Sequence, residues 1–297
     1  MDDSRHGPRL AAQGSLIADL FATRTGVGSP GCGHLGFARV DGATALVRCS
    51  ARSPLRVLVP RHRDRSAWAF LATQGGGLVA GDRIEVTIDV GPGAVAMVAT
   101  QAETKVYRSP SGSECAQVLR AHVARGGSLV LMPDPISPFA GARYVQEQHF
   151  DVDEGGSLLY LDALVAGRTA RGERWAFDDY RSRTELNVRG TLLLGDALVL
   201  GPRPGPSLAD RLGRYQALAV AALVGPAFAG GASDLLDRIG KAHAVVRAPV
   251  LATVSSLPGG ALLRAAATSA EHLTRFVRES LSFVAELLGS DPFAHRW

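Results

Sequence analysis

A regular alternation of apolar and polar residues, interrupted by glycine-rich turns, is the feature that most restricts the fold of this chain. Between residues 84 and 90 every second residue is apolar, and the residues between them are Glu85, Thr87 and Asp89. This period of two predicts a strand with one buried face. The sequence Gly91-Pro92-Gly93 then predicts a turn into a second strand at residues 94–101.

The same pattern continues to about residue 201. Residues 118–123 and 128–132 read as a further pair of strands around Arg125-Gly126-Gly127. The next strand places one set of side chains on one face: Tyr144, Gln146, Gln148, Phe150 and Val152. Turn signals recur about every ten residues, without a fixed-period repeat. We therefore predict a mainly β fold of wound or stacked sheets, of sandwich or solenoid type, with a β-rich body at about residues 32–201.

The remaining residues, about 207–297, predict a mixed α/β portion of the same single domain, 1–297, with about two α-helices. Alanines make residues 215–224 ambiguous, but the β-rich context favours a buried strand. A turn at residues 258–260 predicts strands on either side of it, at 250–256 and 262–267. We expect a short helix at 233–239 capped by Ser233, and a last helix with a capping box of Thr268 and Glu271 and a C-cap at Gly289.

Composition argues against several classes of protein. The formal net charge is only +4 over 297 residues, and Lys105 and Lys241 are the only lysines. The densest basic run, between Arg56 and Arg65, contains Asp64 and no aromatic residue, which favours a solvated loop over a nucleic-acid surface. We expect no nucleic-acid partner.

Cysteine, histidine and apolar patterns predict a soluble, cytoplasmic protein. The three cysteines are not closely spaced, and the eight histidines lack the spacing of a metal site, so neither a disulfide framework nor structural zinc is expected. The N-terminus has no apolar signal segment. The longest apolar run, at about 217–229, is interrupted by Gly225-Pro226 and is too short to span a membrane.

The glycine-rich segment at residues 75–82 has the glycine density of a phosphate-binding loop but not its chemistry. A P-loop needs a lysine followed by serine or threonine, whereas Asp82 follows the last glycine here and would repel phosphate. The segment is better read as a loop in which glycines adopt positive φ and Asp82 bonds the backbone. No nucleotide site is expected.

Three other polar segments have structural as well as functional readings. Glu103 and Lys105 follow a strand and indicate a surface or partner-facing loop. Asp134 lies between two prolines, which favours a rigid, extended segment at an edge or a sheet crossing. Arg171 and Glu173 suit an internal salt bridge or an interface equally well. Since no Gly-x-Ser-x-Gly elbow or local Ser/His/Asp signature is present, we predict no enzymatic activity.

Read in order, several blocks of the chain resemble the UreD/UreH family of urease accessory proteins. The blocks are Ser53-Pro54-Leu55, Gly76-Gly77-Leu78-Val79-Ala80-Gly81-Asp82, Thr100-Gln101 through Tyr107-Arg108-Ser109, Pro133-Asp134-Pro135 with Phe139 and Gly141-Ala142-Arg143-Tyr144, and Gly167-Arg168 with Ala170-Arg171-Gly172-Glu173. They span about residues 35–200. The family often has proline at position 75 and a second glycine at position 80, and residues 215–297 match it only loosely.

The resemblance implies an all-β body with two helices that acts as a non-enzymatic scaffold in urease maturation. The implied partners are a helical accessory protein of the UreF type, an accessory GTPase of the UreG type and the urease apoprotein, in a cytoplasmic complex that allows for a dimer. The GTPase carries the P-loop and the nickel. This subunit bridges the complex to urease and passes nickel through a hydrated channel.

No tightly bound cofactor is implied, only transient nickel. Because a conduit must release its metal, dispersed carboxylates suit it better than a cluster of histidine or cysteine. By their positions in the matching blocks, the carboxylates expected to carry nickel are Asp82, Glu103, Asp134 and Glu173. The residues expected in partner contacts or family motifs are Gly76, Gly77, Gly81, Thr104, Lys105, Tyr107, Arg168 and Arg171.

The alternatives are a β-solenoid enzyme acting on carbohydrate and a β-rich binding module. A glycosidase needs paired carboxylates and usually aromatic platforms. Aromatic residues make up only 6% of this chain, which argues mildly against that reading.

Overall fold

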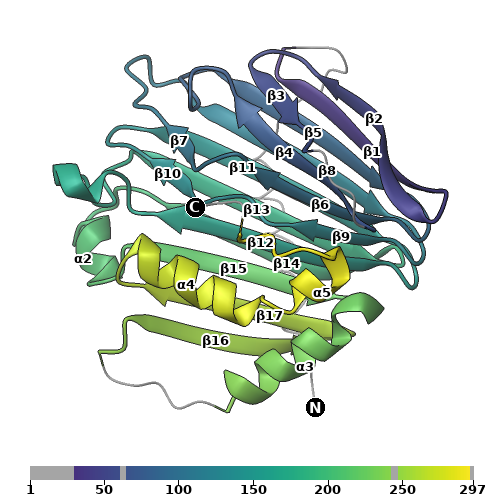
Figure 1. The fold of residues 1–297 in the computed structure, drawn as a ribbon. Coiled ribbons are helices and arrows are strands. Elements are labelled where there is room, and N and C mark those ends of the chain that lie inside the picture. Colours follow the sequence, from purple (N-terminus) through teal and green to yellow (C-terminus); the bar gives the residue numbers. More distant parts are fainter. Residues whose placement is uncertain (1–29, 61–64, 242–246, 295–297) are drawn as a thin grey trace, which may run out of the picture.

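The computed structural model of the chain describes residues 30–60, 65–241 and 247–294. Strands dominate, and they form two stacked sheets (Figure 1). The described residues also form four α-helices, all after residue 207. The prediction of a mainly β fold of wound or stacked sheets, with helices in the C-terminal third, is therefore confirmed.

Sheet A contains seven strands. In spatial order they are β14 (Thr191–Leu200), β13 (Asp179–Val188), β11 (Arg143–Val152), β8 (Cys115–Val123), β5 (Arg83–Val90), β1 (Cys32–Val40) and β2 (Ala43–Ala51).

Sheet B contains ten strands. The main path is β16 (Val250–Leu257), β17 (Gly260–Ala267), β15 (Ala217–Val224), β12 (Ser157–Val165), β9 (Ser128–Leu131), β6 (Val95–Thr100), β4 (Ala67–Thr73) and β3 (Leu55–Leu58). Two short strands, β7 (Thr104–Val106) and β10 (Ile136–Pro138), join beside β12. Strand β15 confirms the strand expected at residues 215–224.

The centre of the molecule is wound like a solenoid. From β5 to β13 the chain alternates between the sheets, so that the neighbouring long strands within each sheet are parallel. Antiparallel pairs occur on both sides of this centre, for example β13 with β14 and β1 with β2. The structure thus combines the two architectures that the sequence left open.

This winding corrects one expected pairing. Residues 118–123 and 128–132 form β8 and β9, but these strands lie in different sheets and do not pair. The turn between them hydrogen-bonds to the next turn instead, from the Gly126 amide to the Gly155 carbonyl at 3.0 Å. Gly126 has a φ of 72°, which favours glycine. These turns carry the chain across the roughly 10 Å between stacked sheets.

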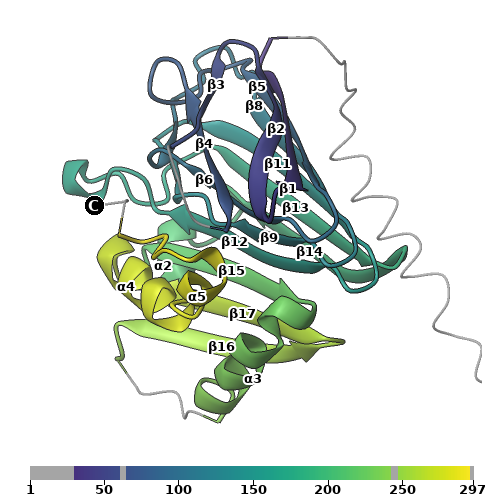
Figure 2. The same ribbon diagram turned by 45° about the vertical axis from the view of Figure 1, so that its right-hand side comes forward.

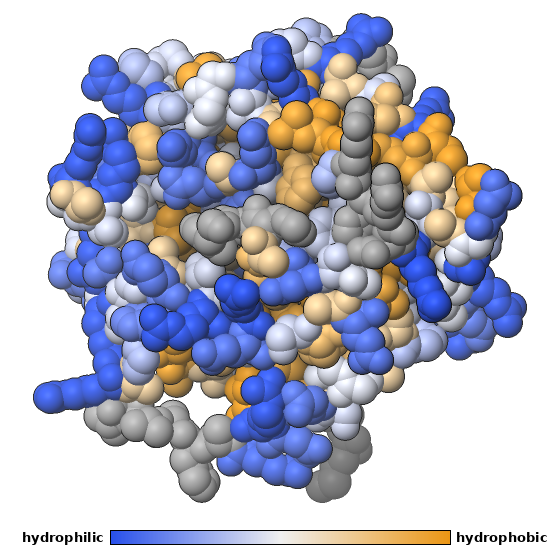
Figure 3. Space-filling view, in the orientation of Figure 1, coloured by the Kyte–Doolittle hydropathy of each residue, from blue (hydrophilic) through white to orange (hydrophobic). Residues whose placement is uncertain are grey.

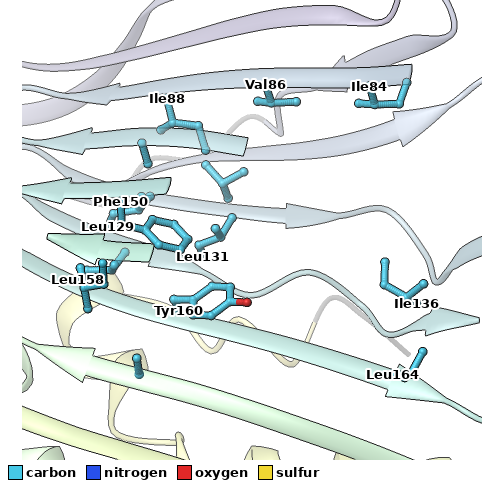
Figure 4. Packing of buried hydrophobic residues seen from close by; sticks show 14 of the residues in the cluster. Ile84, Val86, Ile88, Leu129, Leu131, Ile136, Phe150, Leu158, Tyr160 and Leu164 are labelled. Atoms are coloured by element: carbon cyan, nitrogen blue, oxygen red, sulfur yellow. The ribbon is translucent and has the colours of Figure 1, made fainter. Parts of the chain in front are cut away.

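The first core lies between the two sheets. Figure 4 shows Ile84 and Ile88 of β5 pointing toward the side chains of β9 and β12, among them Leu129, Leu158 and Tyr160. These five side chains are at most 2% exposed. Burial of each large apolar side chain contributes about 1.5–3 kcal/mol. The alternation of apolar and polar residues along β5 places its apolar side chains on the face that packs in this core.

The second core lies on the outer face of sheet B. It is covered by α3 (Ala229–Arg238), α4 (Ala270–Ser280) and α5 (Val284–Leu288) (Figures 1 and 2). Alanines of β15 and β17, including Ala221 and Ala267, let the helices approach the sheet closely. A shorter helix, α2 (Leu208–Leu212), contributes Leu208 to the first core.

Helix α3 begins four residues earlier than the sequence indicated, at Ala229 rather than after a Ser233 cap. Gly230 and Gly231 disfavour a helix locally, and this hid its first turn. Gly231 is required by packing: a Cβ at this position would lie 2.4 Å from the Phe283 ring. A tertiary contact therefore overrides local propensity.

The last helix is divided into α4 and α5 by a turn at residues 281–283. Its N-cap is Ser269, one residue after the expected Thr268, and the Ser269 hydroxyl accepts a hydrogen bond from the His272 amide at 3.2 Å. Gly289 is the C-cap, as expected, with a φ of 81°. Within the described residues, no helix has the length and apolarity needed to cross a bilayer.

The C-terminal helices are tied to an early strand of sheet B. The Ser66 hydroxyl, just before β4, donates a hydrogen bond to the Leu288 carbonyl at 2.6 Å and accepts one from the Trp68 indole at 2.9 Å. Helix α5 also contacts β6. Residues separated by 222 positions thus complete one core.

Candidate functional site

The motif segments of the sequence converge at one end of the two sheets. Two backbone hydrogen bonds connect the glycine-rich loop to residues 105–107. The Leu78 amide donates to the Lys105 carbonyl at 2.8 Å, and the Tyr107 amide donates to the Leu78 carbonyl at 2.9 Å. Gly77 is required by this contact, because a Cβ there would lie 2.7 Å from the Lys105 carbonyl oxygen. Strand β7 then pairs with β10, which follows Asp134. We call these segments the end loops (residues 75–82, 101–109, 133–142 and 167–175).

A stack of side chains holds the outer end loops together. Tyr107 meets Phe139 edge to face with ring centroids 5.3 Å apart, and the Arg168 guanidinium lies 4.2 Å from the centroid of the Phe139 ring. Arg168 also binds Glu173 through two hydrogen bonds, one of them 2.9 Å from Nε to Oε2. Such cation–π and bidentate contacts favour arginine over lysine. The stack fixes the loop that carries Arg168 against β10.

Glu173 is therefore half of an ion pair, and its partner is Arg168. The hydrogen bond and the charge of Arg168 lower the pKa of Glu173, which also accepts a hydrogen bond from the Ala140 amide at 3.2 Å. Arg171 is exposed on the turn at Thr169–Arg171. Of the two readings left open for Arg171 and Glu173, the direct salt bridge does not form, because Arg168 is the residue that pairs with Glu173, and the charge of Arg171 only adds to the lowering of the Glu173 pKa. Its exposed position leaves it available to a partner.

A pocket opens between the sheets among the end loops. Its volume is about 180 Å³, and Gly76, Glu103, Thr104 and Lys105 are part of its lining. We call it the mouth pocket. The Lys105 ammonium lies 3.8 Å from the Glu103 carboxylate, and both side chains are more than 40% exposed. The outer part of the pocket thus offers one carboxylate and one ammonium to solvent.

A second space lies next to the mouth pocket. This inner cavity, of about 60 Å³, shares five lining residues with the mouth pocket: Leu71, Ile84, Thr100, Thr104 and Gln117. It extends to Gln146, Gln148 and Asp162. A volume of about 15 Å³ is enough for one water molecule where polar partners exist, so the cavity has room for several. We call these two adjacent spaces, which extend from the end loops toward Asp162, the route.

The inner wall of this route is a hydrogen-bonded polar network. The Tyr144 hydroxyl bonds the side-chain oxygens of Gln117 and Gln146, the latter at 2.9 Å. The Tyr160 hydroxyl bonds the Gln148 side chain, and the Thr184 hydroxyl donates to the same oxygen at 2.9 Å. Buried polar groups of this kind are costly unless they are paired. Their pairing here keeps a polar surface inside an otherwise apolar core.

Asp162 is the carboxylate of this network. Its Oδ2 accepts hydrogen bonds from the Gln146 amide at 2.9 Å and, more weakly, from the Ser182 hydroxyl at 3.4 Å. Protein surrounds the residue, yet it keeps accessible surface because it borders the inner cavity. Burial raises the pKa of Asp162, the hydrogen bonds oppose this, and the charge of Asp196 raises it further.

The four carboxylates expected to carry nickel are not gathered at one point. Glu103 lines the mouth pocket. Asp134 exchanges hydrogen bonds with the hydroxyl of Thr100, at 2.9 and 2.7 Å, and Thr100 lines both the mouth pocket and the inner cavity. Asp134 itself borders a small space under α4. Asp82 bonds the Val79 amide at 2.9 Å, as the loop interpretation expected.

Some of the residues expected at partner contacts shape the loops or are buried, and others are exposed on the surface. Gly76 and Gly81 have φ values of 70° and 88°, which fit the loop that the sequence predicted. Thr104 is 8% exposed and lines the route, whereas Arg171 is exposed. The basic run from Arg56 to Arg65 falls partly outside the described residues, which omit 61–64.

Metal-binding clusters of the usual kind do not occur in residues 30–60, 65–241 and 247–294, where no group of three or more His, Cys, Asp or Glu side chains could hold an ion. Cys32, Cys49 and Cys115, which all lie in the described residues, form no disulfide with one another. Burial raises the pKa of Cys115 to about 12, so its thiolate is disfavoured. Carboxylate and amide oxygens are therefore the donors that the route offers.

The network was not predicted from the sequence, although a signal was present. Asp162 is the one charged residue within the apolar run at 157–166. A charge in a strand that is buried on both faces is rare unless it has a partner or a role. Gln146 and Gln148 were placed correctly on the face shared with Tyr144 and Phe150, but that face was read only as a strand face.

Comparison with known proteins identifies the family. Residues 29–297 match the model of the family described as UreD urease accessory protein. The chain is 50% identical over 264 residues to "Urease accessory protein UreD" of Anaeromyxobacter sp. (strain Fw109-5), covering 89% of each chain. It is 46% identical over 271 residues to the protein of that name from Sorangium cellulosum (strain So ce56), covering 91% of this chain and 85% of the relative.

The similarity also extends to plants. "Urease accessory protein D" of Oryza sativa subsp. indica is 31% identical over 283 residues, which cover 86% of this chain and 92% of the relative. Relatives in bacteria and plants thus match most of the chain, including the region after residue 215 that resembled the family only loosely by its motifs. The chain belongs to the UreD family of urease accessory proteins.

Proposed function

We propose that this protein is a non-enzymatic scaffold of urease maturation, and that nickel passes through it along the route formed by the mouth pocket and the inner cavity. It joins a helical accessory protein and an accessory GTPase to apo-urease in the cytoplasm. The adjacency of the mouth pocket and the inner cavity, which share five lining residues, carries this proposal, because it brings the family's motif loops next to a polar interior.

The donors along the route support passage rather than storage. Carboxylate and amide oxygens bind nickel less tightly than imidazole or thiolate does. A metal that must leave again needs such weak contacts, as in ion pores. Glu103 in the mouth pocket and Asp162 in the inner cavity supply negative charge along the route. Thr100, which lines both spaces, is hydrogen-bonded to Asp134.

The surface supports a role in binding other proteins. Apolar side chains gather over β1–β4 in the face shown in Figure 3. Exposed large residues of this region include Val47 at 60%, Val59 at 52% and Leu58 at 41%. Contiguous apolar patches on soluble proteins commonly mark interaction sites. Cysteines that form no disulfide agree with a reducing compartment such as the cytoplasm.

The test is nickel loading of urease by the assembled machinery. The chain is co-expressed with urease and the two accessory proteins, and the nickel content of purified urease is measured for Glu103→Gln, Asp134→Asn, Asp82→Asn and Glu173→Gln. We expect the largest loss, several-fold, for Glu103→Gln and Asp134→Asn, with the complex still assembled. Glu154→Gln, at an exposed turn and 66% exposed, is the matched control.

Unchanged nickel loading in all four variants would refute the passage of nickel along this route. If the complex also failed to form with the wild-type chain, the scaffold function itself would be refuted. The assembly is measured by co-purification, so the two outcomes are separate.

A further inference from the structure

We propose that the apolar surface over β1–β4 docks an acidic surface of another protein of the maturation machinery. We call this surface the basic patch, and it consists of the exposed residues Val40, Val47, Leu58, Val59, Arg39, Arg48, Arg56 and Arg65. The inference rests on the scaffold function proposed above. It adds which face of the molecule binds and which charge the partner carries.

The apolar part of the basic patch lies where the two sheets end side by side. β2 is the last strand of sheet A, β3 is the last strand of sheet B, and the two strands contact each other. Val47 is the extra residue of a β-bulge in β2, and a bulge changes the direction in which a side chain points. Val47 is 60% exposed, and Val59, directly after β3, is 52% exposed. Apolar side chains therefore face solvent at this corner of the molecule (Figure 3).

The basic patch carries positive charge that the protein does not neutralise. Residues 30–60 contain four arginines and a single carboxylate, that of Asp41. Within the described residues, no ion pair includes any of the four arginines of the basic patch, which are Arg39, Arg48, Arg56 and Arg65. By contrast, Arg181 of β13 is paired with Glu114. Carboxylates of a partner would supply the missing negative charge.

The partner is expected to dock through side chains and not as an added strand. The bulge at Val47 interrupts the regular pairing of β2. β3 has only four residues and lies between Pro54 and Pro60. Bulges, short strands and prolines all protect a sheet edge from pairing with another chain. The occupant is therefore a folded surface or a helix with its own apolar and acidic side chains.

The same composition disfavours other occupants. A second copy of this chain, related by a two-fold axis, would place arginine against arginine. Surfaces that bind membranes or single-stranded nucleic acid commonly expose aromatic side chains. Phe37 is the only aromatic residue among residues 30–60, and it is 2% exposed. An acidic protein surface fits both the apolar and the charged part of the basic patch.

The basic patch also lies next to the mouth pocket. Leu55 of β3 is part of the lining of that pocket. The Arg56 guanidinium lies against the side-chain amide of Gln74, the residue before the glycine-rich loop. A protein bound to the basic patch would therefore lie beside the end loops.

The test is capture of partner proteins by a charge-reversed chain. The full chain is co-expressed with the helical accessory protein, the accessory GTPase or apo-urease, and with all three together, and the co-purified amount of each is measured. We expect Arg48→Glu/Arg56→Glu to lower the capture of one of the three about tenfold, because it places carboxylates against an acidic surface. Val47→Ser should weaken the same pair less, and added salt should weaken it in the wild type. Arg120→Glu/Arg203→Glu, at exposed positions outside the basic patch, is the matched control.

Equal capture of all three proteins by wild type and Arg48→Glu/Arg56→Glu, at an unchanged melting temperature, would overturn the inference and leave the scaffold function standing. An equal loss in Arg120→Glu/Arg203→Glu would also overturn it, because net charge and not this face would then be the cause. So would a variant that loses only self-association, or only binding to single-stranded RNA or to vesicles containing phosphatidylserine. A wild-type chain that captures none of the three would instead refute the scaffold function, and the inference with it.

Discussion

The two cores of this protein share sheet B but differ in what they enclose. On the outer face of the sheet, the core under α3–α5 is built from apolar side chains in close contact, such as Leu235, Leu281 and Phe228, all at most 1% exposed. Between the sheets, the core includes a carboxylate, glutamines and a cavity. Sheet B therefore separates an apolar core, which stabilises the fold, from a core that contains polar groups and a cavity. Substitutions in each core test this difference.

The largest expected effect is on the helical core. Leu281→Ala should lower the free energy of unfolding by about 2–5 kcal/mol, because it removes a fully buried side chain and leaves a cavity. Urea denaturation measures the change. The nickel loaded per folded molecule should not fall. A loss of loading in protein that is fully folded would show that the two cores are functionally coupled.

A second substitution concerns Gly231. Gly231→Ala places a Cβ about 2.4 Å from the Phe283 ring, so the ring or helix α3 must shift. We expect a destabilisation of about 1–3 kcal/mol, as for other overpacked cores. Gly230→Ala is the matched control, since its Cβ position faces open space and meets no neighbouring element within 4 Å. It should be neutral or slightly stabilising, and equal effects of the two would contradict this packing.

The polar core is expected to respond in the opposite direction. Asp162→Asn, measured without metal at neutral pH, should raise the free energy of unfolding by about 1 kcal/mol, because it removes a buried charge. Burial raises the folded-state pKa of Asp162, so the folded state binds more protons, and wild-type stability declines as pH rises from the unfolded pKa through the folded one.

Asp162→Asn should therefore flatten the pH dependence of the free energy of unfolding between the unfolded-state and folded-state pKa values of Asp162. Thermal unfolding from pH 4 to 8 checks this. Asp151→Asn, at an exposed position of β11, is the control and should keep the wild-type profile. A lower stability of Asp162→Asn throughout would mean that the carboxylate stabilises the core and that the contrast between the two cores is smaller than stated.

The smallest expected effect is at the cap of α4. Ser269→Ala removes the acceptor of the His272 amide and should cost about 1 kcal/mol. A hydrogen bond from Ser269 lowers the pKa of Glu271, so the stability that this carboxylate contributes is present above its unfolded pKa and is lost as pH falls through the folded pKa. The difference between Ser269→Ala and wild type should shrink at low pH. Thr268→Ala is the control, since the Thr268 hydroxyl bonds the His272 ring at 3.0 Å and not the backbone amide that the cap satisfies.

The sequence predicted the strands well because half-buried strands carry a local signal, as in residues 84–90. It did not predict which strands pair, since Gly126 and Gly155 mark turns without showing whether the chain returns in the same sheet or crosses to the other. The motif loops were identified as important, and the structure brings them together. The polar network was not found, because Gln146 and Asp162 become neighbours only when the two sheets stack.

The hydrogen bond between Ser66 and the Leu288 carbonyl has a consequence for synthesis of the protein. A chain that is still on the ribosome cannot close its second core until residue 288 has emerged, and Trp68 and Met97 stay uncovered until then. Parallel strands with distant partners already fold slowly. The nascent chain therefore presents a long-lived apolar sheet face, and any shortened product that stops before α5 keeps that face open to other proteins.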